Sequence, residues 1–182
     1  MNSMVIMGVA GCGKSSLGVE LAQQLNLPIV EGDDHHSTDS LNKMQRGIAL
    51  TDADRAGWLA ALGRQLQQHP EGMVLTCSAL KRAYRDQLRQ SAPGLGFVFL
   101  DITREQATAR VAARASSHFF STSLVESQFA TLEVPTGEAG VLRVDGQLPL
   151  ASLQVEVCDW LNHHKQFHQN QFRQEQFQKE QL

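Results

Sequence analysis

The residues with the clearest chemistry lie close to the start of the chain. They fit the phosphate-binding pattern G-x-x-x-x-G-K-[ST] and read Gly8, Val9, Ala10, Gly11, Cys12, Gly13, Lys14 and Ser15. The glycines let the backbone turn so that its N–H groups face phosphate oxygens. The ammonium group of Lys14 can reach the β- and γ-phosphates, and the hydroxyl of Ser15 can bind Mg²⁺. The pattern therefore predicts a site for a nucleoside triphosphate with Mg²⁺.

The elements around this loop are those that such a site needs. Residues 4–7 form a short apolar run that predicts a buried strand. Residues 16–25 predict a helix with leucines at 17, 21 and 25 on one face. The partial positive charge at the start of that helix, where Ser16 stands, favours a bound anion.

A dinucleotide-binding loop is the nearest alternative for the same stretch. Residues 11–16 begin like G-x-G-x-x-G, and Asp33 and Asp34 lie about 20 residues farther on, where a ribose-binding acid would stand. However, Ser16 replaces the final small residue of that pattern, and a dinucleotide loop has no use for adjacent Lys14 and Ser15. The triphosphate interpretation is therefore favoured.

Acidic residues end the second predicted strand, residues 28–31. Glu31 is its last residue, and Asp33 follows closely. In open α/β sheets the ligand crevice lies at the carboxyl ends of the strands, so Asp33 can accept the proton of a substrate hydroxyl. Glu31 can order a water molecule bound to Mg²⁺. A solvated turn carboxylate remains the alternative for Asp33 and, more strongly, for Asp34.

Strands and helices alternate along the rest of the chain. Repeated βα units with buried strands imply an α/β fold of three layers, a P-loop kinase fold with helices on both faces of a parallel sheet. Thr51 and Asp54 predict a capped helix start. Further strands are expected at 73–77, 96–100 and 141–144, helices at 41–44, 51–68, 80–90, 103–114, 124–132 and 150–163, and a mobile loop, which would serve as the lid, at 115–123.

The chain of 182 residues is long enough for one domain with a sizeable core, which we place at residues 1–165. Residues 166–182 are rich in glutamine and carry Phe167, Phe172 and Phe177 at regular intervals. This interval of five matches no helical or coiled-coil repeat, so the rings cannot form one stripe. We expect a frayed helix or a disordered end rather than a partner-binding element.

Composition argues against several classes of function. The net charge of −3 provides no basic excess for binding nucleic acid. No apolar run approaches the roughly 18 residues that a membrane span needs, so we expect no membrane partner. The first residues lead directly into a core strand, which argues against a signal peptide. Three scattered cysteines favour reduced thiols in a cytoplasmic protein.

Among proteins with this loop, a GTPase-like switch fits poorly. Residues 54–57 match D-x-x-G as letters, but they lie inside a predicted helix, and residues 42–45 lack the final aspartate of N-K-x-D. A small-molecule kinase needs an acceptor carboxylate and a cationic lid. Arg110 and Arg114 lie four residues apart on one helix face, and both can point toward the nucleotide. Arg114, nearer the loop, is expected to contact the transferred phosphate.

Three later stretches resemble the gluconate kinase family. The first is the substrate region, Gly32-Asp33-Asp34-His35-His36 with Lys43-Met44, Gly47, residues 50–55 and Trp58-Leu59. The second comprises residues 77–81, 84–86 and 88–89, and the third is the lid region, with His118-Phe119, residues 127–129, Leu132-Glu133 and Pro135. The similarity extends from Met4 to Leu161. Together these motifs favour this family over adenylate or shikimate kinases.

The resemblance implies phosphorylation of D-gluconate by ATP and Mg²⁺ at its terminal hydroxyl, giving 6-phosphogluconate, usually by a homodimer. Gluconate is a polyol with one carboxylate, so its site should combine cations with hydrogen-bonding groups. Besides Asp33, the candidates for this role are His36, Arg55, Lys81, His118 and Gln128. For Arg55 the alternative is a local helix ion pair with Asp52 or Asp54.

The sequence departs from the family pattern in a few places. Glu31 stands where aspartate is common, Ser37 where proline is usual, and the stretch 114–118 is one residue longer. Other functions therefore stay open: a kinase for another sugar acid or a shikimate-like polyol, or a protein that binds ATP without turnover. Lys14, Ser15 and Asp33, all present, argue against the last.

Overall fold

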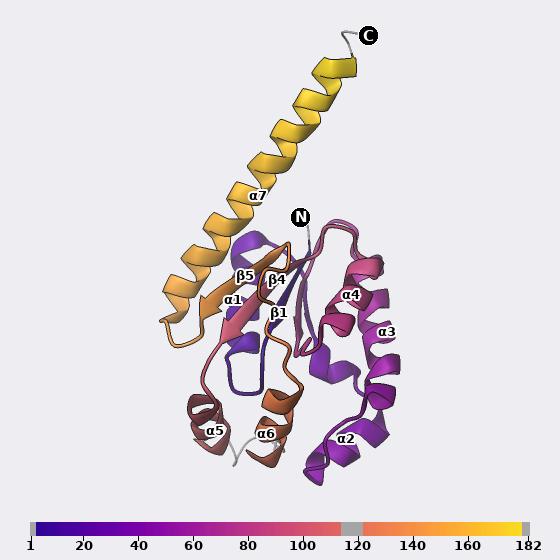
Figure 1. Ribbon diagram of the computed structural model, residues 1–182, viewed down its shortest axis with the longest axis vertical. Helices are drawn as coiled ribbons and strands as arrows, with labels where there is room; N and C mark the ends of the chain where they lie inside the picture. The colour runs from indigo at the N-terminus through magenta and orange to yellow at the C-terminus, as the bar shows by residue number, and fades with distance from the viewer. Residues whose placement is uncertain (1–2, 114–121, 180–182) are drawn as a thin grey trace.

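Five parallel strands form the centre of the fold. The computed structural model describes the backbone of residues 3–113 and 122–179, and their side chains through residue 164 except that of Thr122. Because the strands are all parallel, their carboxyl ends meet at one edge of the sheet. They pair in the order β2-β3-β1-β4-β5 (Figure 1) and are β1 (Met4–Met7), β2 (Ile29–Glu31), β3 (Val74–Cys77), β4 (Gly96–Asp101) and β5 (Val141–Asp145).

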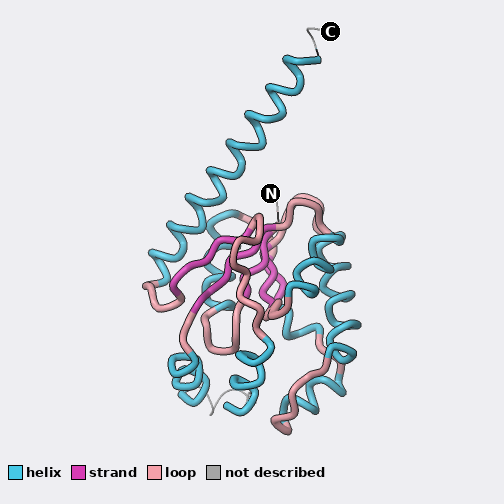
Figure 2. The backbone as a smooth tube through the Cα atoms, in the orientation of Figure 1, coloured by secondary structure: helices cyan, strands magenta, loops and turns pink. Residues whose placement is uncertain are grey.

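Helices cover both faces of this sheet, as Figure 2 shows. Helices α1 and α7 pack on one face, and α3 and α4 pack on the other. The short helices α2, α5 and α6 lie toward the carboxyl edge of the strands (Figure 1), and η1 directly follows β2. The bounds are α1 (Lys14–Leu25), the 3₁₀ helix η1 (Gly32–His35), α2 (Thr38–Gln45), α3 (Asp52–Gln68), α4 (Arg82–Ser91), α5 (Arg104–Ala113), α6 (Thr122–Thr131) and α7 (Leu150–Lys179).

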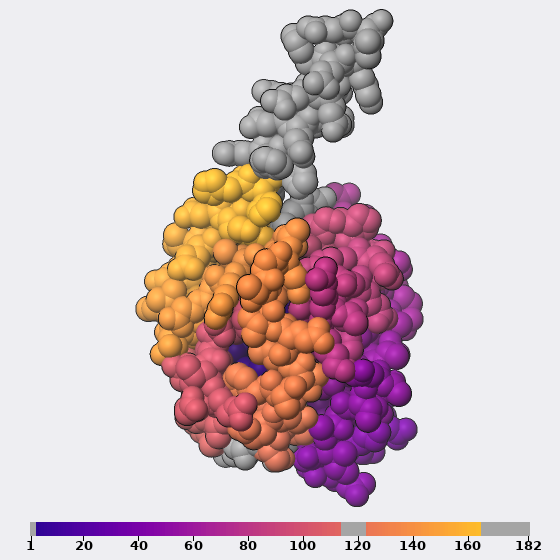
Figure 3. Space-filling view, viewed as in Figure 1, coloured from indigo at the N-terminus to yellow at the C-terminus, as the bar shows by residue number. Residues whose placement is uncertain are grey.

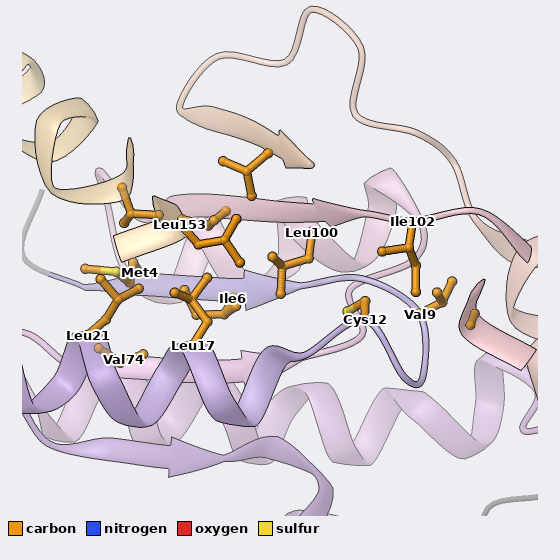
Figure 4. Close-up of a cluster of buried hydrophobic side chains, with 14 of the residues drawn as sticks. Met4, Ile6, Val9, Cys12, Leu17, Leu21, Val74, Leu100, Ile102 and Leu153 are labelled. Atoms are coloured by element: carbon orange, nitrogen blue, oxygen red, sulfur yellow. The ribbon is translucent and has the colours of Figure 1, made fainter. Parts of the chain in front are cut away.

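Side-chain alternation along β1 explains why both faces are covered. Successive side chains of a strand point to opposite faces of its sheet. Met4 and Ile6 lie with residues of α1 and α7 in one buried cluster (Figure 4), while Val5 and Met7 lie with α3 and α4 in the other. A strand that is apolar at every position can therefore bury both faces only between two layers of helices.

A buried guanidinium joins segments that are distant in the sequence. Arg85 of α4 is fully buried and donates hydrogen bonds to the carbonyl oxygens of Ala79 (2.9 Å) and Leu80 (3.1 Å), which follow β3. It also donates to the carbonyl oxygen of Glu133 (3.1 Å), which follows α6, and forms an ion pair with the Glu138 carboxylate. The Arg85 hydrogen bond holds the pKa of Glu138 below its usual range.

The start of α3 is fixed by the capping arrangement that the sequence predicts. The N–H of Asp54 donates to the Thr51 hydroxyl (3.2 Å), and the N–H of Thr51 donates to the Asp54 carboxylate (2.9 Å). The ammonium of Lys43 in α2 also contacts that carboxylate at 2.6 Å. The first turn of α3, which carries residues of the cavity described below, is therefore held against α2.

The α/β class and the three layers are confirmed, and most predicted elements lie within a few residues of their observed bounds. Two local features differ. Helix α2 begins at Thr38, ahead of the predicted 41–44, because the Ser37 side chain caps it by accepting from the N–H of Ser40 (3.2 Å). Residues 32–35 form η1, a turn of 3₁₀ helix that the sequence analysis did not predict.

The last helix is longer than the predicted 150–163. Helix α7 continues to Lys179 and extends well past the sheet and the other helices (Figure 1). The backbone of the glutamine-rich extension is therefore helical over most of its length, while the domain boundary at residue 165 stays a prediction. None of the described helices combines the length and the apolar character needed to cross a membrane.

Two glycines of α3 allow a matched test of its packing against α4. A Cβ added at Gly63 would lie 2.4 Å from Ser91 Oγ, whereas nothing lies within 4 Å of one added at Gly57. We expect Gly57→Ala to raise the free energy of unfolding by about 0.5–1 kcal/mol, because alanine favours helix. Gly63→Ala should give a value at least about 1 kcal/mol below that of Gly57→Ala, because the Ser91 side chain must shift to make room. Urea unfolding measures both, and equal effects would contradict the close approach at Gly63.

Candidate active site

A cavity of about 690 Å³ opens at the carboxyl edge of the sheet. In the space-filling view, a hollow between the red and orange segments exposes the indigo start of the chain at its floor (Figure 3). The cavity wall comes from the loop after β1, from η1, α2 and α3, from the loop after β3, and from α5 and α6. Its described lining comprises Ala10, Gly11, Gly13, Lys14, Ser15, Ser16, Glu31, Asp33, Asp34, His36, Leu41, Met44, Leu50, Arg55, Trp58, Ser78, Val111 and Gln128.

The loop between β1 and α1 has the backbone conformation that its glycines permit. Gly8, Gly11 and Gly13 have φ angles of 141°, 80° and 106°, in the left-handed region that favours glycine. The Lys14 ammonium donates hydrogen bonds to the carbonyl oxygens of Gly8 and Val9, both at 3.2 Å. Lys14 therefore bends back over the loop, where the pattern predicts the β- and γ-phosphates.

Arg110 of α5 braces this loop from outside the cavity. Its guanidinium donates to the carbonyl oxygens of Gly11 and Cys12, both at 3.4 Å, and to that of Gly146 after β5 at 3.0 Å. It thereby joins two loops at the carboxyl edge, while its predicted contact with the nucleotide stays a prediction. Burial raises the pKa of the Cys12 thiol, so this side chain stays neutral and packs as a small apolar residue.

The acidic residues after β2 lie in η1 rather than in extended backbone. Asp33 and Asp34 both line the cavity, because successive residues of a 3₁₀ turn do not alternate between opposite sides as they would in a strand. Glu31 lines the cavity as well, and its carboxylate accepts a hydrogen bond from the Thr76 hydroxyl of β3. Three carboxylates therefore gather beside the phosphate loop.

Arg55 is a buried cation in the cavity wall. Only 8% of the residue is exposed, and its guanidinium donates to the carbonyl oxygen of Leu50 at 3.0 Å. The local ion pair considered from the sequence is not formed, since Asp52 is bonded to Lys81 and Asp54 to Lys43. Within the described residues, Arg55 has no carboxylate partner. The Tyr84 ring lies 5.9 Å from the guanidinium carbon but carries no negative charge, and a buried cation without an opposite charge is costly, so this site favours a negatively charged ligand.

Lys81 lies outside the described cavity lining. Its ammonium contacts both carboxylate oxygens of Asp52, at 2.7 and 2.8 Å, and the Tyr84 hydroxyl donates to the same carboxylate. These hydrogen bonds, first that of Lys81 and then that of Tyr84, lower the pKa of Asp52. Lys81 is thus engaged in an ion pair at the start of α3, and its role toward substrate stays a prediction.

His36 lies at the acceptor side of the cavity, with 5% of its side chain exposed. Its ring stacks on Trp58 with centroids 4.3 Å apart and an interplanar angle of 14°. The Nε2 atom is 3.9 Å from the Asp33 carboxylate, too long for a hydrogen bond. Burial lowers the pKa of His36, so the imidazole is neutral at neutral pH.

Gln128 of α6 reaches the phosphate-binding loop. Its side-chain oxygen accepts a hydrogen bond from the N–H of Ala10 at 2.6 Å. It therefore lies nearer the phosphate side of the cavity than the substrate role predicted for it requires. Two other candidates, Arg114 and His118, and the lid proposed at 115–123 up to residue 121, lie outside the described residues.

Some lining residues were not named as site residues from the sequence, although Met44, Leu50 and Trp58 belong to the stretch that resembles the family's substrate region. Trp58 packs in the core cluster of α3 and α4, and it also lines the cavity. Leu41, Met44 and Leu50 form an apolar wall of the cavity and belong to one small cluster with Leu124 of α6. Their spacing in the sequence is that of ordinary helix packing, so no local signal distinguishes them from core residues.

Comparison with known proteins places the chain in a class. Residues 4–135 match the model of a protein family described as an AAA domain. A solved sugar kinase from Janibacter sp. HTCC2649 has 36% sequence identity and a TM-score of 0.84, covering 89% of this chain and 95% of that one. The five-stranded parallel sheet, the glycine-lysine-serine loop and the cavity beside it define a P-loop kinase.

Two similar proteins specify the family within this class. A gluconokinase from Gluconobacter oxydans is 44% identical over 147 residues, which cover 79% of this chain and 82% of that protein. A solved gluconokinase from Sinorhizobium meliloti 1021 has 43% identity and a TM-score of 0.78, covering 90% of this chain and 97% of that one. The chain belongs to the gluconokinase family.

The contact of Gln128 with the phosphate loop leads to a charge test. We expect Gln128→Glu to raise the dissociation constant of ATP about tenfold, because the carboxylate would repel the negatively charged triphosphate. Gln128→Leu removes the hydrogen bond from Ala10, which a glutamate oxygen would still accept, and adds no charge, so it should change that constant by less than about threefold. Calorimetric titration at two salt concentrations measures both, and the Glu effect should shrink at high salt. Equal dissociation constants for the two variants would show that Gln128 lies away from the nucleotide.

Proposed function

We propose that this protein transfers the γ-phosphoryl group of ATP to the terminal hydroxyl of D-gluconate, giving 6-phospho-D-gluconate and ADP. Family membership supports the reaction, and the cavity supports the substrate. One half of the cavity is the phosphate-binding loop, and the other half carries Asp33, His36 and Arg55. A kinase for a sugar acid needs both halves side by side.

The buried guanidinium of Arg55 is the observation that carries the choice of substrate. It lines the acceptor half and, among the described side chains, has no acidic partner. A carboxylate can accept two parallel hydrogen bonds from one guanidinium and supply the missing charge. Gluconate offers that carboxylate at one end and the reacting hydroxyl at the other, so Arg55 would hold the end opposite to the chemistry.

The transfer itself needs little covalent chemistry from the protein. The acceptor oxygen forms a bond to the γ-phosphorus, the bond from that phosphorus to the β–γ bridging oxygen breaks, and ADP leaves. Asp33 takes the proton of the acceptor hydroxyl. Lys14 stabilises charge on the β- and γ-phosphates, and Arg114 would add a second cation from the lid.

The oxygen donors beside the phosphate loop fit a magnesium ion. Ser15 and Glu31 both line the cavity, and Mg²⁺ prefers hydroxyl, carboxylate and water oxygens. Ser15 would bind the ion directly and Glu31 through a water molecule, because its carboxylate also accepts from Thr76. Bound there, Mg²⁺ would neutralise charge on the transferring phosphate.

The remaining expectations belong to the same proposal. Residues 1–165 would form the kinase domain, with 166–182 as an extension, and the active protein would be a cytoplasmic homodimer, as the family resemblance and the cysteine content indicate. Cys12 and Cys77 are buried thiols, which accords with a reducing compartment. Arg110, Lys81 and His118 keep their proposed roles toward nucleotide and substrate.

A coupled assay of ADP release tests the proposal. The acceptors are D-gluconate, other sugar acids, shikimate and nucleoside monophosphates, each with ATP and Mg²⁺. We expect gluconate to have the highest kcat/KM. A higher value for another acid would move the proposal to that substrate, and no turnover with any acceptor would favour a protein that binds ATP without catalysis.

Replacement of Asp33 tests the proton acceptor. Asp33→Asn keeps the size of the side chain but removes the charge, so kcat should fall by about 10²- to 10⁴-fold while ATP still binds. Asp34→Asn is the matched control, since Asp34 lies in the same turn and also lines the cavity. We expect it to be the milder change in steady-state kinetics. If Asp34→Asn is inactive and Asp33→Asn turns over normally, the two roles are reversed.

Replacement of Arg55 tests the carboxylate contact. Arg55→Gln should raise the KM for gluconate about tenfold to a hundredfold, because a charge-assisted hydrogen bond is lost. The KM for ATP should stay within about twofold, since Arg55 lies on the acceptor side. Arg64→Gln, at an exposed position of the same helix, is the control. An unchanged KM for gluconate in a folded Arg55→Gln enzyme would remove the observation on which the choice of substrate rests.

A further inference from the structure

Trp58 contacts one end of the turn η1, which carries Asp33. The indole Nε1–H donates a hydrogen bond to the carbonyl oxygen of Gly32 at 2.7 Å. On the opposite side, the N–H of Gly32 donates to the Thr76 hydroxyl of β3 at 3.3 Å. A Cβ added at Gly32 would lie only 2.2 Å from the Thr76 carbonyl oxygen. The first residue of η1 is therefore clasped between α3 and β3.

The same indole also holds the other end of the turn. Its ring stacks on His36, the residue that follows η1, with the centroids 4.3 Å apart. The N–H of His36 donates back to the carbonyl oxygen of Asp33 at 3.4 Å. One side chain thus contacts the residues on both sides of Asp33 and Asp34. The imidazole Nδ1 is buried and, among the described side chains, is without a hydrogen-bond partner.

Packing alone does not account for these contacts. Leu59, Leu62 and Leu66 of α3 fill the core with apolar side chains, and a leucine or phenylalanine at position 58 would do the same. Trp58 instead spends its only polar group on a backbone carbonyl of η1, and it lines the cavity with 4% of its surface exposed. A hydrogen bond from a buried indole N–H fixes the orientation of the Gly32 carbonyl, which apolar packing alone would not do.

We propose that Trp58 is a positioning residue of the phosphoryl-transfer site, which fixes the turn 32–36 at both ends so that Asp33 and His36 meet the acceptor hydroxyl in one arrangement. Trp58 acts through Gly32 and His36 and takes no proton itself. The inference rests on the proposed function, because it gives Asp33 the acceptor hydroxyl. Small displacements of a catalytic group cost large factors in rate, so a loosened turn should lower kcat more than it changes substrate binding.

The chain offers a matched pair of tryptophans for the test. Trp58→Phe keeps a ring against His36 but removes the N–H donor to Gly32. Trp160→Phe is the control, because Trp160 lies half-buried on α7, where its ring meets His164 edge-on at 4.8 Å. We expect Trp58→Phe to lower kcat with gluconate about tenfold to a hundredfold, with the KM for ATP close to that of Trp160→Phe. Its Tm should be lower than that of Trp160→Phe, because a buried side chain becomes smaller and the Gly32 carbonyl loses its donor. Trp58→Leu, which loses the stack as well, should be slower still.

Hydrogen exchange gives a readout that does not depend on turnover. In Trp58→Phe the backbone amides of residues 33–36 should exchange about tenfold faster than in the wild type, while those of β1 and α1 keep their protection. Thr76→Val, which removes the opposite clasp of Gly32, should show the same faster exchange at 33–36, and only its exchange is compared because Thr76 also bonds Glu31 of the proposed magnesium site. A kcat for Trp58→Phe within twofold of the wild type would overturn the proposal. A loss of ATP affinity by the same factor as the loss of kcat would overturn it as well.

The two proposals fail in different ways. If the wild type phosphorylates another acceptor faster than gluconate, the proposed function fails, and the Trp58 variants are measured with that acceptor. If the wild type phosphorylates gluconate and Trp58→Phe does so equally well with unchanged exchange at 33–36, only the positioning role fails.

Discussion

The geometry of the site depends on the hydrogen bonds and the ion pair of the buried Arg85 guanidinium. Its donors hold the loop after β3, the segment after α6 and the Glu138 carboxylate around one point of α4. A fully buried charge is stable only when its partners surround it, and removing one partner from such a pair costs about 3–5 kcal/mol. The loop after β3 and the segment after α6 are therefore held together next to Ser78 and Gln128, which line the cavity.

The cavity has two halves that are built differently. The phosphate half is backbone, with glycines in left-handed conformation and an ammonium folded over them. The acceptor half is made of side chains that lie on a short 3₁₀ turn and on α3. Phosphoryl transfer depends on positioning and electrostatics more than on covalent chemistry. A fold that fixes these halves separately can keep the nucleotide half unchanged while its acceptor half adapts to a particular substrate.

The two halves differ in how far the sequence predicts them. The phosphate loop can be predicted from the sequence because its glycines, lysine and serine all lie within eight consecutive residues. The flanking strand and helix follow from local hydrophobic patterns. The acceptor half is harder to predict from the sequence. Asp33 was assigned from its place after a strand, but the turn that brings Asp34 beside it was not foreseen. Lys81 was expected in the site, and the structure pairs it with Asp52 instead, 29 positions away.

The sequence by itself determined the α/β class, the nucleotide loop, the cap of α3 and the family, because each of these is encoded by neighbouring residues or by short repeats of apolar positions. Only the tertiary structure decided which charges are neutralised inside the protein and which are left for a ligand. Arg55 stands next to two aspartates in the sequence and Lys81 has no acidic residue within four positions, yet among the described residues Lys81 forms an ion pair and Arg55 does not. Pairing of charges depends on distances between segments, and those distances exist only once the helices have packed on the sheet.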